Sequence, residues 1–210
     1  QLEAGDIATT YEPYKAAQTI ETTHPLRGIP VTTGGNYTDE NGQQWICDEV
    51  DLERGVYVQR IKHMILPSTF IINASTNEMW VQLNSNDTAA YSLDEKQCYC
   101  THYPGVSRQE IYNNAFKEGF RAICLRDTVV RIVDNVLFNG NPSAFNAWIA
   151  EKAASGENVG VSYILNNPVE TPLSETEIAA YRALHTNKPN TTILNDSGAH
   201  MKVKYAADTK

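Results

Sequence analysis

Apolar and polar residues alternate in short runs over most of the chain after residue 43. Alternation with a period of two is typical of half-buried β-strands, and these runs are rich in β-branched and aromatic residues, which favour strands. The runs are residues 55–64, 70–72, 79–83, 98–103, 122–126, 129–133 and 161–165. The pattern therefore predicts a mainly β fold, of the sandwich or jelly-roll-like kind.

Capping signals predict two or three short helices among these strands. The capping boxes at 107–110 and 174–177 each place a serine three residues before a glutamate, an arrangement that satisfies free backbone N–H groups at a helix start. Asn141 precedes Pro142, and this pair is favoured at the N-cap and at the first helical position. Apolar residues at helical spacing follow each signal, so we expect helices after residues 107, 141 and 174.

Three regions follow from this reading of the chain. Residues 1–43 contain Pro13, Pro25 and Pro30 and resemble an extended lead-in from a preceding domain. We expect residues 44–172 to form the β-rich domain. We expect residues 173–210 to form an appendage of one helix and a C-terminal strand, because residues 201–205 alternate again.

Composition narrows the functional classes. The chain has 210 residues, of which 41% are hydrophobic and 20% charged, as in a globular protein. Its formal net charge is −8, which disfavours binding to nucleic acid or to an anionic membrane surface. The longest uncharged run, residues 135–150, contains four asparagines, one glycine and one proline. It is too short and too polar to cross a bilayer, so we expect no membrane insertion.

The cysteines offer one candidate metal site. Cys98, Cys100 and His102 alternate along a predicted strand, so their side chains would point to one face, and thiolate and imidazole are zinc ligands. A second zinc knuckle is missing from the sequence. Small buried thiols and a packed histidine are therefore the favoured interpretation, with the cysteines reduced and no cofactor expected.

Carboxylates could support glycan hydrolysis, but the sequence places no pair at a defined separation. The acidic run 48–53 lacks the spacing of a calcium loop and fits a solvated edge. The sequence contains no nucleophile elbow, phosphate loop or zinc-protease motif. We therefore expect a protein that is not an enzyme. Carboxylates available for the alternative, a glycan-degrading enzyme, are Glu49, Asp51, Glu110, Asp127 and Asp134.

Aromatic side chains are the remaining candidates for ligand binding. Tyrosine and tryptophan have rigid apolar bodies and polar tips, which suit stacking on sugars and protein interfaces. For any single residue, a place in the core or at its rim is the alternative. The candidates near predicted strand edges or loops are Trp80, Tyr91, Tyr99, Tyr103 and Tyr112.

Three long stretches resemble a known family. The first is Asn-Gly-Gln-Gln-Trp-Ile-Cys-Asp-Glu-Val-Asp-Leu-Glu-Arg-Gly-Val-Tyr-Val-Gln-Arg-Ile at 41–61; the second covers 169–174 and 179–193; the third is Asn-Asp-Ser-Gly-Ala-His-Met at 195–201. Together they resemble the C-terminal region of minor structural, tail-associated proteins of phages and prophages of Gram-positive gut bacteria. Residues 8–15 resemble the exit from a preceding β-rich domain in such proteins.

The resemblance implies a virion component at the phage tail, made in the bacterial cytoplasm, and no catalytic motif comes with it. We expect a tail-fibre-like structural and adhesion module whose partners are other virion tail proteins and a host cell-wall glycan. A homotrimer would suit a fibre and would raise avidity. The alternatives are the glycan-degrading enzyme and a virion assembly adaptor. The start without Met and the end at Lys210 lead us to expect a piece of a longer protein.

Overall fold

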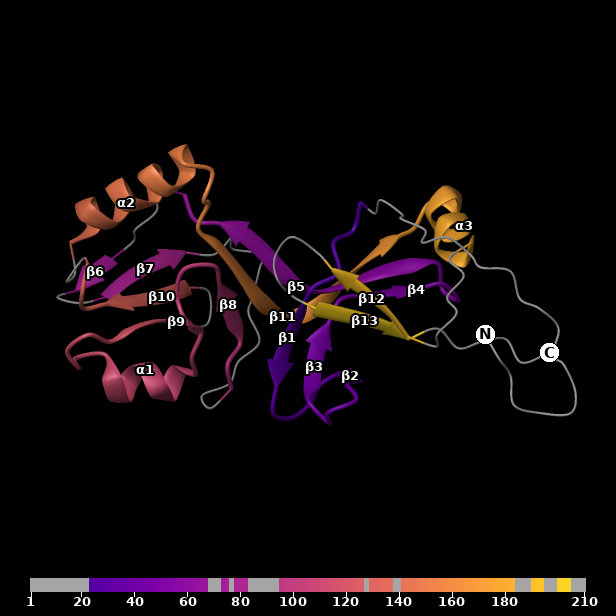
Figure 1. Cartoon of the computed structure of the whole chain (residues 1–210), viewed down its shortest axis with the longest axis horizontal. Helices are drawn as coiled ribbons and strands as arrows, with labels where there is room; N and C mark the ends of the chain where they lie inside the picture. The colour runs from indigo at the N-terminus through magenta and orange to yellow at the C-terminus, as the bar shows by residue number, and fades with distance from the viewer. Residues whose placement is uncertain are drawn as a thin grey trace, which may run out of the picture.

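The computed structural model describes residues 23–67, 73–75, 78–82, 95–126, 129–137, 141–183, 190–194 and 200–204. These residues form several antiparallel sheets and three helices, which confirms the predicted mainly β fold with few short helices. Figure 1 shows two lobes side by side. They are joined by two long antiparallel strands, β5 (Val56–Ile65) and β11 (Gly160–Pro172).

One lobe, here called the terminal lobe, comprises residues 23–61 and 164–183. β3 lies between β1 and β2 in one sheet, and β4 pairs with the N-terminal end of β5. Leu26, Tyr57 and Leu173 are buried together, and Ile178 of the helix packs against them. The elements of this lobe are β1 (Gly28–Val31), β2 (Tyr37–Thr38), β3 (Gln44–Cys47), β4 (Glu49–Asp51) and α3 (Glu175–Ala183).

The other lobe, residues 62–163, is called the inserted lobe because the chain enters it on β5 and leaves it on β11. A four-stranded sheet in the order β6-β7-β10-β9 separates α2 from α1, as Figure 1 shows. Phe145 and Ile149 of α2 pack with Met79, Ile123 and Ile132 in a large buried cluster, here called the main core. Ile111 of α1 packs on the opposite face of β9 and β10. The elements are β6 (Asn73–Ser75), β7 (Glu78–Gln82), β8 (Cys98–Cys100), α1 (Arg108–Asn114), β9 (Arg121–Arg126), β10 (Val129–Asp134) and α2 (Pro142–Ala154).

In the inserted lobe, the β6-β7-β10-β9 sheet and strands β8, β11 and β5 curl around the main core, and the backbones meet closely at one point. β8 pairs with β11, and the chain after β8 forms a parallel bridge between Gly105 and Ile123 of β9. A Cβ atom at Gly105 would lie 2.2 Å from the carbonyl oxygen of Cys98, so only glycine fits at this point. The bridge continues the β6-β7-β10-β9 sheet toward β8, β11 and β5.

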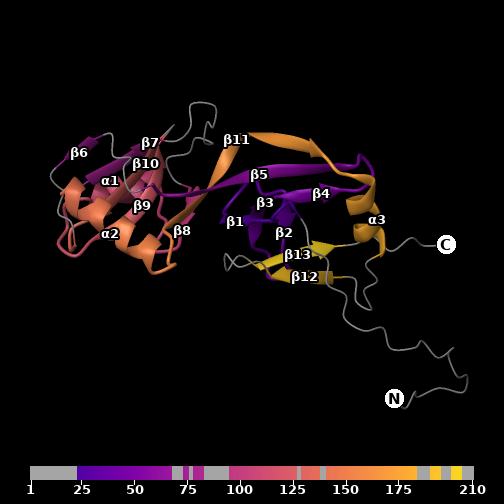
Figure 2. The ribbon, with the colours of Figure 1, turned by 90° about the horizontal axis from the view of Figure 1, so that it is seen from above.

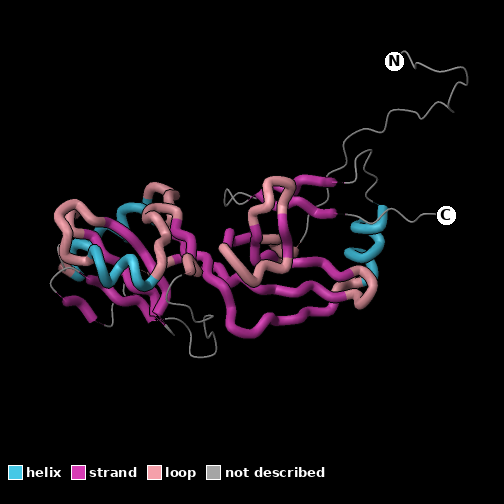
Figure 3. Tube along the Cα trace, turned by 90° about the horizontal axis from the view of Figure 1, so that it is seen from below, coloured by secondary structure: helices cyan, strands magenta, loops and turns pink. Residues whose placement is uncertain are grey.

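The ribbon of β5 and β11 is irregular between the lobes, and Figures 2 and 3 show it running from one lobe to the other. Ile164 lies opposite Ile61 and Val169 opposite Gln59, so residues 165–168 of β11 face only Arg60. This bulge includes Pro168, which cannot donate a ladder hydrogen bond. Extra residues in one strand bend a ribbon, and the bend falls where one core ends and the next begins.

Asp48 holds β5 at this bend. Its Oδ1 accepts from the backbone N–H groups of Arg60 (2.7 Å) and Ile61 (2.8 Å), and its Oδ2 accepts from that of Arg27 (3.0 Å). Successive N–H groups of a regular strand point to opposite sides, so two of them on one oxygen indicate that β5 is bent as well. The carboxylate thus replaces a missing strand neighbour beside the bulge.

The cap signals correctly located all three helices. The Ser107 side chain accepts from the N–H of Glu110 at 3.1 Å, and that of Asn141 accepts from the N–H of Ser143 at 3.1 Å. At α3, the box is reciprocal: Ser174 Oγ accepts from the N–H of Glu177, and Glu177 Oε2 accepts from the N–H of Ser174. Local side-chain chemistry was therefore sufficient to predict where helices begin.

Among the residues that the structure describes, the expected lead-in and the helix of the expected appendage are parts of the terminal lobe. Residues 28–38 contain β1 and β2, both paired with β3, and are part of the terminal lobe rather than a lead-in. Helix α3 belongs to the core of the same lobe. β12 (Asn190–Leu194) and β13 (His200–Lys204) pair with each other, as the alternation near the C-terminus indicated. Residues 1–22 and the predicted strand at 70–72 lie outside the described residues.

We expect His63 to make the stability of the ribbon depend on pH. Its Nδ1 lies 3.0 Å from Ser162 Oγ on the facing strand, and burial, with a smaller effect of the Arg27 charge, lowers its pKa. A histidine whose pKa is lower in the folded state than in the unfolded state stabilises the fold when it is neutral. This contribution is fully present above the unfolded pKa of about 6.5 and is lost as the pH falls through the folded pKa.

We therefore expect the melting temperature to fall on acidification from pH 8 to pH 5, and to fall less in His63→Gln. Thermal unfolding of both proteins followed by circular dichroism at several pH values measures the difference. An equal pH dependence of the two proteins would show that His63 does not contribute. Comparison with the variant removes the effect of other groups that titrate in this window.

Candidate functional site

The described aromatic candidates all lie in the inserted lobe. Trp80 is on β7, Tyr99 on β8, Tyr103 in the turn after β8, and Tyr112 on α1. Tyr91 lies outside the described residues. The structure therefore gathers the predicted side chains in one half of the molecule, although they occupy different faces of it.

Tyr103 is a core residue. Its side chain is buried and its hydroxyl donates to Asp134 Oδ2 at 3.0 Å. Burial and the adjacent carboxylate both raise the pKa of this phenol. Arg121 donates to the same Asp134 oxygen, also at 3.0 Å. Tyr103 thus offers no face to a ligand in this structure, and its hydrogen bond helps to hold the end of β10.

Tyr99 has an exposed side chain on the edge strand β8. Half of the residue, 50%, is accessible, and the Lys96 ammonium lies 6.0 Å from the ring centre. The flanking residues Cys98 and Cys100 point into the core, as alternation on a strand requires. Tyr99 is therefore available to a ligand; it belongs to the β4-β5-β11-β8 sheet, whereas α1 packs on β9 and β10.

Trp80 and Tyr112 are brought together by a residue that the sequence reasoning missed, Arg131. Arg131 lies opposite Trp80 in the β10–β7 register, on the sheet face that α1 covers. Its Cζ is 5.8 Å from the Trp80 ring and 4.9 Å from the Tyr112 ring, distances at which a cation is attracted to an aromatic face. Arg131 is only 5% exposed, so it holds α1 against the sheet.

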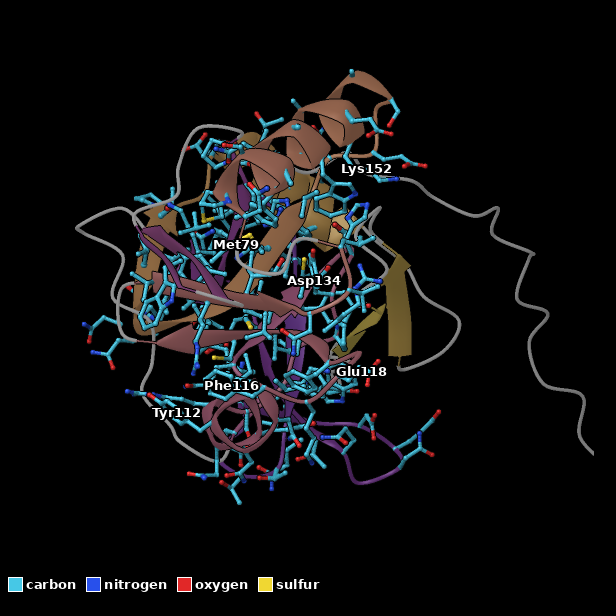
Figure 4. The ribbon with its side chains drawn as sticks, turned by 90° about the vertical axis from the view of Figure 1, so that its left-hand side faces the viewer. Met79, Tyr112, Phe116, Glu118, Asp134 and Lys152 are labelled. Atoms are coloured by element: carbon cyan, nitrogen blue, oxygen red, sulfur yellow. The ribbon has the colours of Figure 1, made fainter. Side chains whose placement is uncertain are left out.

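Arg108 and Phe116 extend this cluster along α1 and just past its end. Arg108 and Tyr112 are spaced four residues apart on α1, which places their side chains on one side of the helix, and Phe116 follows the Ala115 cap. Arg108 Nε donates to the Tyr112 hydroxyl at 3.2 Å, and its Cζ lies 5.7 Å from the ring. Tyr112 is 42% exposed and Phe116 83%. We call these three residues the α1 stripe; Figure 4 views this end of the molecule and labels Tyr112 and Phe116.

Cys98, Cys100 and His102 do not share one face, because β8 ends at Cys100 and the chain bends over the next residues. Both cysteines are buried in the main core, where burial raises their pKa values. His102 lies edge-on to Trp148 of α2 with ring centres 5.4 Å apart. Among the residues that the structure describes, no three His, Cys, Asp or Glu side chains are grouped to hold a metal ion.

The candidate carboxylates are divided between the lobes. Glu49 and Asp51 are on β4, and Glu49 forms an ion pair with Arg60 at 2.7 Å. Glu110 is exposed in the first turn of α1, whereas Asp134 is fully buried and also accepts from the N–H groups of Val136 and Leu137. Asp127 lies outside the described residues.

The exposed surface of the inserted lobe is thus the best-defined candidate site, with the α1 stripe at its centre. None of the described helices is long and apolar enough to cross a membrane. Comparisons of the chain with protein-family models, with curated proteins and with solved structures find no match.

Proposed function

We propose that this chain is a non-catalytic structural and adhesion module of a phage tail, in which the terminal lobe joins the virion and the inserted lobe contacts a host cell-surface glycan. The observation that carries the proposal is the course of the chain. It leaves the terminal lobe on β5, builds a second core of its own, and returns on β11. Such an insertion displays a surface without interrupting the scaffold that supports it.

The distribution of the resembling stretches supports this division. Residues 41–61 and the described part of the second stretch, up to Ala183, lie in the terminal lobe, in β3, β4, the first part of β5, β11 and α3. None of the three stretches falls within residues 62–163. The lobe that resembles tail proteins is therefore the one assigned to the virion, and the lobe without resemblance is the one assigned to the host.

Exposed aromatic side chains support a glycan as the ligand. Tyr99, Tyr112 and Phe116 of the inserted lobe are 50%, 42% and 83% exposed. Aromatic rings provide flat apolar faces on which sugar rings stack, and a tyrosine adds a polar tip. Single shallow sites of this kind bind weakly, so a trimer of the module would strengthen attachment through effective concentration.

The proposal is tested by incubating the intact protein with purified cell walls from several Gram-positive gut bacteria. We expect saturable co-sedimentation with at least one wall and no release of reducing sugar. Release of reducing ends, lost when one carboxylate is replaced, would overturn the proposal in favour of a hydrolase. Binding to virion tail proteins but to no wall would overturn it in favour of an assembly adaptor. Light scattering on a sizing column gives the oligomeric state.

A further inference from the structure

Prolines occupy particular positions in the sheets of the terminal lobe. Of the prolines in the described residues, three lie within strands: Pro30 in β1, and Pro168 and Pro172 in β11. β1 is an outer strand of the β1-β3-β2 sheet. Among the described strands, residues 169–172 of β11 pair with β5 alone, and Figure 2 shows β11 on the outer side of β5. Both segments are therefore sheet edges, the places at which a further strand can be added.

The register of β11 shows that its outer side has few hydrogen-bond donors. The N–H of Leu173 donates to the carbonyl of Gly55 at 2.9 Å, and in an antiparallel pair every second residue faces the same neighbour. The backbone groups of residues 169, 171 and 173 therefore face β5, and those of Glu170 and Pro172 point to the outer side. Proline has no N–H group. Pro172 is thus unable to donate at this edge, and Pro168, two residues before Glu170, lacks the group as well.

The outer side of β1 is blocked in a related way. The N–H of Asp48 donates to the carbonyl of Arg27 at 2.9 Å, so residues 27, 29 and 31 face β3 and residues 28, 30 and 32 point away from it. Pro30 occupies the middle one of these three outer positions and has no N–H to offer. The N–H of Thr32 donates to Glu95 Oε2 at 3.3 Å, and the Thr32 hydroxyl donates to Oε1 of the same carboxylate. The inserted lobe, to which Glu95 belongs, thus covers the end of this edge.

Without its prolines, the edge of β11 would favour pairing. Residues 166–172 are all exposed, and valine and threonine, which favour strands, stand at positions 169 and 171. An exposed edge of this kind is a template for another chain. Glu170 lies between these two residues and forms an ion pair with Arg54 at 2.5 Å, and charge at an edge also discourages pairing. The outer strands on the opposite sides of the sheets, β2 and β4, are only two and three residues long.

We propose that Pro30, Pro168 and Pro172 close the long edges of the terminal lobe to a further β-strand, so that neighbouring chains, a second copy included, contact this lobe through side chains. An added antiparallel strand needs a donor at every second residue of the edge. Along residues 168–172 it would find one N–H, that of Glu170. The inference goes beyond the proposed function, since it holds for any neighbour of the lobe. For a virion neighbour, it excludes a joint in which an extended segment of one protein completes the sheet of the other.

The wild-type protein provides the first test, by hydrogen exchange of the intact chain at increasing concentration. The amide of Glu170 points to the outer side and should exchange rapidly at every concentration, whereas the amide of Thr171, which faces β5, should be protected. Protection of Glu170 that grows with concentration would show that the edge pairs in the wild type, and would overturn the inference.

Substitution of the prolines provides the second test. In Pro168→Thr/Pro172→Thr the edge gains two N–H groups, and we expect copies to pair along β11. The average molar mass from light scattering on a sizing column should at least double relative to wild type, and the Glu170 amide should exchange about tenfold more slowly in the associated form. Pro30→Thr tests the edge of β1 in the same way, with the amide of Gly28 as the reporter.

The matched control is Pro142→Thr. Pro142 lies at the start of α2, where an N–H group has no partner within the helix, so this substitution opens no sheet edge and should keep the wild-type mass. In the edge variants, an unchanged mass with rapid exchange at the reporter amide would overturn the inference for the edge concerned. A larger mass without slower exchange at that amide would also overturn it, because the new contacts would lie elsewhere.

The two tests remain informative separately from the proposed function. Circular dichroism shows whether each variant keeps the fold, and the wild-type experiment requires no substitution. Binding of cell walls by the inserted lobe is measured by co-sedimentation, so its failure would overturn the proposed function and leave the closed edges standing.

Discussion

Replacing Asp134 by alanine should destabilise the inserted lobe by about 2–3 kcal/mol, because its fully buried carboxylate accepts hydrogen bonds from several groups, among them the partly exposed Arg121. The carboxylate accepts from Tyr103 Oη and Arg121 Nε, each at 3.0 Å. It also accepts from the N–H groups of Val136 and Leu137 at 2.9 and 2.8 Å. Alanine leaves four donors without this acceptor, and buried donors without partners are costly.

Urea unfolding monitored by circular dichroism and tryptophan fluorescence measures this effect. Two of the three tryptophans, Trp80 and Trp148, lie in the inserted lobe, and Trp45 lies in the terminal lobe. Glu118→Ala removes an exposed carboxylate of the same lobe and should change stability by less than about 0.5 kcal/mol; Figure 4 labels both residues. Tyr103→Phe removes one hydrogen bond and should cost about 1 kcal/mol. A loss below 1 kcal/mol for Asp134→Ala would contradict the account of the network.

Asp48→Ala should destabilise the terminal lobe by about 3 kcal/mol, because three backbone N–H groups at the bend would lose their acceptor. Burial raises the pKa of Asp48, although the hydrogen bonds from Ile61, Arg60 and Arg27 lower it. The charge is therefore only partly compensated, which keeps the net contribution below the sum of three bonds. Asp48→Asn retains one acceptor oxygen but turns an NH2 group toward the N–H of Arg27, so it should lie between wild type and alanine.

Urea unfolding gives the loss of unfolding free energy in Asp48→Ala, and hydrogen exchange shows which part of the fold is loosened. We expect faster exchange at the amides of Arg27, Arg60 and Ile61 in Asp48→Ala, with little change in α1. Glu53→Ala is the matched control, since it removes an exposed carboxylate from the turn after β4. Unchanged protection of the amides of Arg60 and Ile61 in Asp48→Ala would show that the carboxylate does not hold the bend.

Elements whose signals are local could be predicted from the sequence. The caps at Ser107, Asn141 and Ser174 located the three helices, since a cap depends on residues within one turn. Alternation located β7, where Met79 and Val81 point into the main core. In both cases, neighbouring residues alone determine the pattern.

Features that depend on distant partners could not be predicted. Residues 28–31 became β1 because they pair with residues 44–47, and the prolines around them had suggested a lead-in. The bulge at residues 165–168 is defined by the register with β5. The division into two lobes follows from the same nonlocal pairing, since β5 and β11 are more than ninety residues apart in the chain.

The candidate site was only partly predictable for the same reason. Tyr112 could be proposed from its type, but its exposure depends on how α1 lies on the sheet. Arg131 is an arginine in the middle of the apolar run 129–133, and this was the signal available for it. Its contacts with Trp80 and Tyr112 join β10 to β7 and α1, and no spacing in the sequence indicates them.

Footprinting on the host surface tests the central claim, that the inserted lobe contacts the host and the terminal lobe does not. Hydrogen exchange of the intact protein, measured free and bound to a purified cell wall, compares the two lobes in one experiment. The account predicts protection over residues 108–116 and no change in β3, β4 or α3. Protection of β3, β4 and α3, with α1 unchanged, would contradict it.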